Sequence, residues 1–141
     1  DRDGWPPALL LIGDKVVTDA PPRELYPHEL DLGAAWKDLT GLPFVYALWM
    51  CRAGDETRPE VRAAADILDR ARRHNATRAD WLVASAAPQR RWPTELAATY
   101  VGELLRYDVG ERERDAVGEF LRRAADLGIA PRVEPKWADM E

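Results

Sequence analysis

The sequence of 141 residues holds a single cysteine, Cys51, and only two histidines. One cysteine excludes an intrachain disulfide, and with it the small secreted folds that disulfides hold together. So few cysteines and histidines also argue against a zinc site. Cys51 ends an apolar run with no histidine beside it, so we interpret it as a small buried residue rather than a nucleophile.

Long apolar runs and an excess of positive charge are missing as well. No stretch approaches the roughly 20 apolar residues of a membrane-spanning helix. The net charge is -5, from 25 acidic and 20 basic residues, whereas nucleic-acid binding needs a concentrated basic field. We therefore expect no membrane and no nucleic-acid partner. A hydrophobic fraction of 46% and a charged fraction of 32% are ordinary for a globular domain.

Two apolar runs predict strands. Residues 8–12 are continuously apolar and end at Gly13-Asp14, and Phe44 to Cys51 is apolar on both faces. Runs of this kind are typical of central strands that are covered on both sides, as in parallel sheets. Trp36 and Trp49 are expected to take part in packing, either in the core around these strands or against another lobe of the protein.

The remainder of the chain predicts helices. Apolar residues recur at helical spacing, and capping residues, glycines and prolines mark the ends. Thr40-Gly41 stops a short helix in the manner of a glycine C-cap, and Gly128 with Pro131 stops the last one. The predicted helices cover residues 34–39, 57–73, 77–86, 93–106 and 110–127.

These elements predict an α/β fold with two or more central strands followed by about four helices. The expected division is a strand-containing part over residues 1–52, a helical part over 53–131, and a tail over 132–141. A sheet covered on both faces has about five or six strands. We therefore expect the other strands to lie upstream of Asp1, either on a separate polypeptide that packs with this chain or in a longer chain of which these residues are a part.

Two motifs resemble the MqnA family of chorismate dehydratases. The first is Leu10-Leu11-Ile12-Gly13-Asp14, and the second is the ungapped run from Asp31 to Trp49, which reads DLGAAWKDLTGLPFVYALW. The segments Tyr107 to Glu113 and Phe120 to Gly128 are similar to the end of the same family. The likeness extends over nearly the whole chain and corresponds to the C-terminal half of a family member.

The resemblance implies the two-lobed fold of type II periplasmic binding proteins, with a ligand cleft between α/β lobes. Pro43 to Cys51 would then cross the hinge towards the first lobe, where the C-terminal helices pack. The implied activity is that of a cytoplasmic hydro-lyase, which removes water from chorismate to give 3-[(1-carboxyvinyl)oxy]benzoate in the futalosine route to menaquinone. The implied partner is the N-terminal half of the same enzyme, without which the chain is expected to be inactive.

Other functions stay open at this point. The 1,4-dihydroxy-6-naphthoate synthase of the same pathway shares the fold and part of the second motif. A domain of this fold can also bind a small anion without catalysis, because a fold does not determine an activity. A purely helical interaction module over residues 57–127 is the third alternative.

Asp14 is the candidate catalytic residue. It directly follows a predicted buried strand, where ligands approach open α/β sheets. A carboxylate there is able to act as an acid or base, or to contact the hydroxyl that leaves as water. The alternative role is that of a turn or helix-cap aspartate. The scheme requires no metal and no organic cofactor.

The second motif contains the candidate substrate-binding residues. A hydroxyl and backbone N–H groups at the end of its helix are suited to a carboxylate, and the following residues are suited to the walls of a pocket for a ring. Helix termination and core packing are the alternative roles. The candidates are Thr40, Gly41, Leu42, Pro43, Phe44 and Tyr46.

Overall fold

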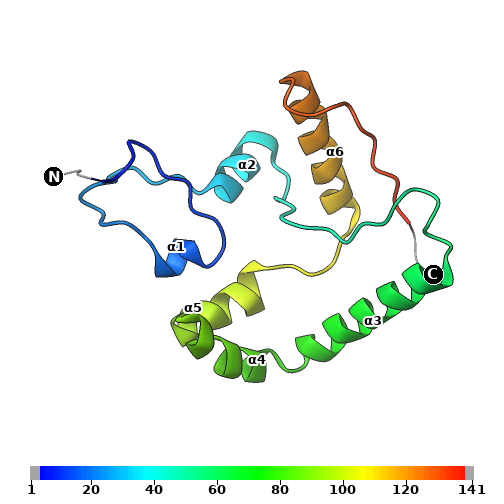
Figure 1. Cartoon of the computed structure of the whole chain (residues 1–141), viewed down its shortest axis with the longest axis horizontal. Coiled ribbons are helices and arrows are strands. Elements are labelled where there is room, and N and C mark those ends of the chain that lie inside the picture. Colours follow the sequence, from blue (N-terminus) through cyan, green and yellow to red (C-terminus); the bar gives the residue numbers. More distant parts are fainter. Residues whose placement is uncertain (1–3, 139–141) are drawn as a thin grey trace. The chain divides into compact units, whose positions relative to one another are not determined.

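The computed structural model describes residues 4–138, which form helices joined by irregular segments (Figure 1). The longer helices are α3 and α6, and a short 3-10 turn and a π-helical turn flank α5. The elements in chain order are α1 (Lys15–Thr18), α2 (Leu32–Thr40), α3 (Pro59–Ala76), α4 (Ala79–Ala86), η1 (Pro88–Arg90), α5 (Thr94–Thr99), η2 (Tyr100–Leu104) and α6 (Glu111–Asp126).

The predicted α/β fold is wrong for the described part of the chain, because residues 4–138 contain no strand. Residues 8–12 and 43–51 are irregular, and neither forms a ladder with another segment. An apolar run reports a tendency towards burial, whereas a strand also needs a neighbour for its backbone N–H and C=O groups. The predicted two-lobed fold with central strands is wrong for this part of the chain for the same reason.

Exposure shows that these runs are not covered on both faces. Leu10 is 67% exposed and Ile12 is 74% exposed, while Trp49 and Met50 reach 83% and 90%. Cys51 is also exposed, so the prediction of a buried cysteine is wrong. Trp49 does not lie in a core of the described chain, which leaves packing against another lobe as the untested part of its prediction. Trp36, in contrast, is half-buried as predicted.

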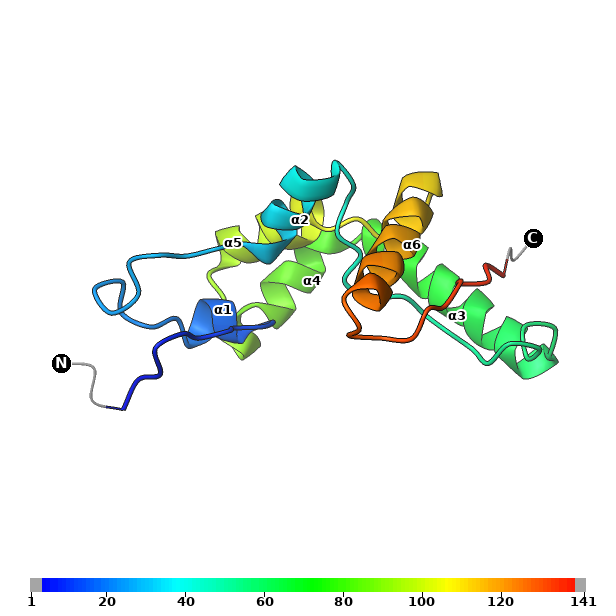
Figure 2. The same cartoon turned by 90° about the horizontal axis from the view of Figure 1, so that it is seen from above.

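The chain divides into two compact units. Unit 1 comprises Asp1–Leu30 and Arg73–Arg106, and unit 2 comprises Asp31–Arg72 and Tyr107–Glu141. The core of unit 1 is small: Val83, Ala87 and Ala97 are buried, and Trp92 and Val101 pack against them. Helices α4 and α5, which contain Val83 and Ala97, lie side by side in both views (Figures 1 and 2).

Unit 2 is built around α6, whose Ala116 is only 2% exposed. Beside it, the rings of Trp36, Phe44 and Phe120 meet edge to face, with centroids 5.7 to 6.1 Å apart. Helix α6 begins after Gly110, whose N–H donates to the Glu113 carboxylate at 2.9 Å, as in half of a capping box. It ends before Gly128, which has the left-handed φ of 70° expected of a terminating glycine.

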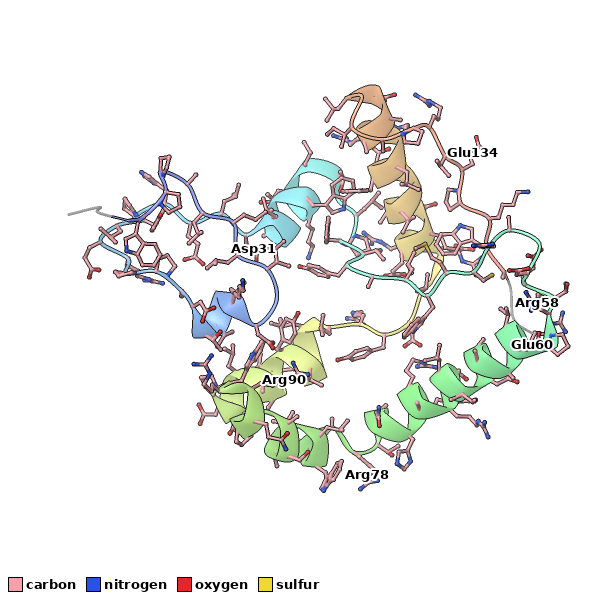
Figure 3. The ribbon with its side chains drawn as sticks, in the orientation of Figure 1. Asp31, Arg58, Glu60, Arg78, Arg90 and Glu134 are labelled. Carbon is pink, nitrogen blue, oxygen red and sulfur yellow. The ribbon has the colours of Figure 1, made fainter. Side chains whose placement is uncertain are left out.

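Asp31 caps the start of α2 (Figure 3). One of its carboxylate oxygens, Oδ1, accepts the N–H of Gly33 at 2.8 Å and that of Ala34 at 3.0 Å. These bonds satisfy two of the N–H groups that a helix start leaves without a helical partner.

Replacing Asp31 by alanine is expected to lower the free energy of unfolding by about 1 kcal/mol, because both capping bonds are lost. Urea denaturation followed by circular dichroism measures the change. Asp38→Ala is the matched control, since Asp38 is an exposed residue inside the same helix. Equal losses in the two variants would contradict the capping role.

Candidate functional site

The turn that follows α2 is closed by its own hydrogen bonds. Gly41 has a left-handed φ of 72°, and its N–H donates to the Lys37 carbonyl at 2.7 Å. The Thr40 hydroxyl donates to the Trp36 carbonyl at 2.7 Å and accepts the Leu42 N–H at 3.2 Å. The N–H groups proposed for a carboxylate therefore have acceptors within the chain. The Leu42 bond is the longest of the three, so it is the one that a bound carboxylate would most readily replace.

Arg112, in the first turn of α6, brings a positive charge to this turn. Its Nη2 donates to the Gly41 carbonyl at 2.7 Å, and its side chain is otherwise exposed. The sequence analysis did not identify Arg112. It lies 71 residues from Gly41 along the chain, so no local pattern links the two. A guanidinium has five N–H donors in a planar fork, and one bond to a carbonyl uses only one of them.

The predicted ring-binding residues lie against the aromatic cluster of unit 2. The Pro43 carbonyl accepts the indole N–H of Trp36 at 3.1 Å. The Phe44 ring lies 4.9 Å from that of Tyr46, centroid to centroid, and Tyr46 is 69% exposed. Gly33 leaves room for the Tyr46 side chain, because a Cβ at that position would lie 2.5 Å from its hydroxyl oxygen.

Phe44 and Tyr46 border an open, mostly apolar groove of about 490 Å³, whereas Pro43 is not among its lining residues. The groove runs between α6 and the irregular segment that follows α2. It is lined by Trp36, Phe44, Val45, Tyr46, Ala47, Leu48, Met50, Ala116, Val117, Phe120 and Leu121. Thr40 and Gly41 are not among the lining residues, so the turn and the groove are two adjoining features of unit 2 rather than one pocket.

A second, more open cavity of about 800 Å³ adjoins Leu42, and half of its lining residues are charged. Glu111, Arg114, Asp115 and Glu119 line it, together with Trp137. Three carboxylates against one guanidinium make this cavity unsuited to a dianion, because like charges repel at short range.

The Glu119 carboxylate is held by two guanidinium groups of its own helix, α6. Both of its oxygens accept from the Arg122 guanidinium, at 2.7 and 2.9 Å, and Oε1 also accepts from Arg123 at 2.6 Å. These bonds, those from Arg122 above all, favour the charged form and lower the pKa of the Glu119 carboxyl from 4.5 to about 2.

The contribution of Glu119 to the free energy of unfolding is therefore expected to depend on pH. Because the folded-state pKa is lowered, the contribution is fully present above pH 4.5 and is lost as the pH falls through about 2. Carbon-13 NMR of the side-chain carboxyls is expected to place the Glu119 midpoint near that lower value. Arg122→Gln should move the midpoint back towards 4.5. A midpoint that does not move would show that Arg122 is not the main cause.

Asp14 lies in unit 1, immediately before α1. It occupies the N-cap position, but its side chain makes no capping hydrogen bond. The carboxylate instead accepts the Arg90 Nη1 at 3.0 Å and the Trp92 Nε1 at 3.1 Å. The structure thus brings Thr40 to Tyr46 together in unit 2 and surrounds Asp14 with different residues in unit 1. Arg90 and Trp92 were not identified from the sequence, because they lie 76 and 78 residues away.

The described residues contain neither a metal-binding cluster nor a helix suited to crossing a membrane. Within residues 4–138, no three His, Cys, Asp or Glu side chains gather in a way that suits a metal ion. None of the helices in this range combines the length and the apolar character that crossing a membrane requires.

Among known proteins, no solved structure matches the chain, but one family model does. A family model described as menaquinone biosynthesis matches residues 2–126, which include Asp14, the run from Asp31 to Trp49 and the whole of α6. The match confirms the resemblance to the MqnA family. The chain therefore belongs to this family of menaquinone biosynthesis enzymes and has a role in that pathway.

Proposed function

We propose that the protein is a chorismate dehydratase of the futalosine route, a hydro-lyase that forms 3-[(1-carboxyvinyl)oxy]benzoate. The observation that carries the proposal is the family match over residues 2–126. The run from Asp31 to Trp49 supports the dehydratase over the later naphthoate synthase of the pathway, because Phe44-Val45-Tyr46-Ala47 followed by Trp49 resembles the dehydratase version.

The reaction removes the C3 proton and the C4 hydroxyl of chorismate, and water is released as the ring becomes aromatic. Asp14 is proposed to take the proton or to contact the departing hydroxyl. The enolpyruvyl carboxylate of the substrate is the alternative base. No step in this scheme requires a metal or an organic cofactor.

The residues of unit 2 are proposed to bind the substrate. Thr40, Gly41 and Leu42 would receive a carboxylate, with the Leu42 N–H exchanging its Thr40 acceptor for the ligand. Arg112, whose Nη2 already lies 2.7 Å from the Gly41 carbonyl, supports an anion at this position because it supplies the compensating charge. Pro43, Phe44 and Tyr46 would border the ring, as the adjoining aromatic groove suggests.

We also propose that the 141 residues alone do not complete the reaction. Chorismate has two carboxylates and a hydroxyl, whereas the predicted residues amount to one turn, one aromatic wall and one carboxylate. The further contacts would come from the N-terminal half expected from the family resemblance. This chain on its own is accordingly expected to bind chorismate weakly and not to convert it.

The test is incubation of the protein, in the assembly it forms in its own organism, with chorismate. Liquid chromatography with mass detection is expected to show a product lighter by one water and aromatic in its absorbance. Heat-treated protein is the control for spontaneous breakdown of chorismate. Formation of dihydroxynaphthoate from its precursor would instead favour the synthase. Tight binding of another anion without any turnover would favour a binding domain, and either result would sink the dehydratase assignment.

A further inference from the structure

The Asp14 carboxylate is held by two donors that approach different oxygens. Arg90 Nη1 donates to Oδ2 at 3.0 Å, and Trp92 Nε1 donates to Oδ1 at 3.1 Å. The carboxylate does not cap α1, so helix capping does not explain its orientation. Each carboxylate oxygen is able to accept about two hydrogen bonds, so this arrangement leaves capacity for a ligand proton or hydroxyl.

Both donors come from one tight turn of unit 1, where Arg90 is labelled in Figure 3. The Ala87 carbonyl accepts the N–H of Arg90 at 3.1 Å and that of Trp92 at 2.9 Å. Between the two donors, Arg91 has a φ of 59° and is the only non-glycine residue with positive φ among those described. A left-handed conformation costs a non-glycine residue about 1 kcal/mol, so the surrounding bonds must hold this turn in place.

Trp92 is the more rigid of the two donors. Its ring packs against the buried residues Val83, Ala87 and Ala97, and its centroid lies 5.3 Å from that of Tyr100. The Arg90 side chain, in contrast, is 65% exposed, and Asp14 is 48% exposed. Water screens an ion pair of this exposure, which therefore contributes little to stability. The core-packed indole of Trp92 therefore orients a carboxylate that is itself half-exposed. Stabilisation of the fold alone would not require this arrangement.

We propose that Arg90 and Trp92 are positioning residues that fix the direction of the Asp14 carboxylate towards the substrate. The inference rests on the proposed function, because Asp14 is its proposed acid–base group. Trp92 sets the plane of the carboxylate through Oδ1, and Arg90 holds the second oxygen. A group that is misdirected by a fraction of an ångström loses catalytic efficiency while substrate binding elsewhere continues.

The test compares Trp92→Phe and Arg90→Gln with the unaltered protein in its native assembly. Phenylalanine keeps an aromatic ring against the core and removes the N–H donor together with the smaller ring of the indole. Each variant is expected to lower kcat for chorismate about tenfold, as expected for a lost bond to a charged group, with KM changed less than twofold. Arg90→Lys is expected to recover part of the loss. Trp81→Phe, on the exposed face of α4, and Arg70→Gln, on α3, are matched controls that should leave kcat unchanged.

A second readout tests the geometry without any substrate. In the nitrogen-15 NMR spectrum of the 141-residue chain, the Trp92 indole N–H signal is expected to shift in Asp14→Asn and to stay in place in Asp19→Asn. An unmoved signal overturns the inference. Chorismate turnover that survives Trp92→Phe and Arg90→Gln at the original kcat also overturns it, while the proposed function stands. If the unaltered protein gives no product, the proposed function fails, and the positioning role fails with it even where the indole signal shifts.

Discussion

Replacing Trp36 by alanine is expected to lower the free energy of unfolding by about 2–3 kcal/mol. Trp36 is half-buried, so the loss is smaller than for a tryptophan in a closed core. The substitution removes edge-to-face contacts with Phe44 and Phe120, at 6.1 and 5.7 Å between centroids. It also removes the indole bond to the Pro43 carbonyl at 3.1 Å. The loss is large because these contacts join α2, the following segment and α6.

Two further variants separate these contributions. Trp36→Phe keeps a ring in the cluster but removes the N–H donor, so a loss of about 1 kcal/mol is expected. Trp49→Ala is the control: the residue type and the motif are the same, but Trp49 is 83% exposed, and the change should stay within about 0.5 kcal/mol. Urea denaturation of all three variants gives the comparison. Equal effects at positions 36 and 49 would show that the cluster does not stabilise unit 2.

The helices of the protein were predictable because their signals are local. Each predicted helix has a counterpart in the structure, and the stops at Gly41 and Gly128 have the left-handed φ that their positions suggested. A glycine or proline next to a periodic run acts within a few residues, so a single sequence contains the information. The residue ranges of α4 and α6 differ from the prediction by no more than two residues at either end.

The strands were not predictable in the same way, since a strand is a relation between two segments. Residues 8–12 and 44–51 have the composition of covered strands, but the described chain provides no ladder partner for them. Phe44 instead meets helix residues through its ring, and Trp49 is exposed. Apolar continuity was thus a correct indication of where side chains gather around Phe44, and a wrong indication of backbone pairing.

The candidate site was predictable only in part, for a related reason. The turn from Thr40 to Pro43 lies within one continuous motif, so the sequence was able to locate it. Its partner Arg112 and the two donors to Asp14 lie more than 70 residues away in sequence, and none is marked by spacing. Contacts of this range follow from tertiary packing, which a local pattern does not contain.

Asp14→Asn is expected to lower kcat for chorismate by about 10²- to 10⁴-fold in the native assembly, the range typical of a lost acid–base group. The amide keeps an oxygen that is able to accept the Trp92 N–H, so the local fold should persist. The amide is unable to take a proton, and it also loses the ion pair with Arg90, which spans 3.0 Å in the unaltered protein. Steady-state kinetics measures the effect, and thermal unfolding checks that the variant is folded.

Asp14→Glu distinguishes a chemical role from a structural one. The longer side chain keeps the charge but displaces the carboxylate, so kcat should fall about 10²-fold if direction matters. Asp19→Asn, at the other end of the four-residue helix α1, is the matched control and should retain full activity. A turn-stabilising aspartate would give the opposite pattern, with lower stability and unchanged kcat in Asp14→Asn. The missing capping bond at Asp14 argues against the helix-cap role alone, because the carboxylate accepts from donors far along the chain rather than from its own helix.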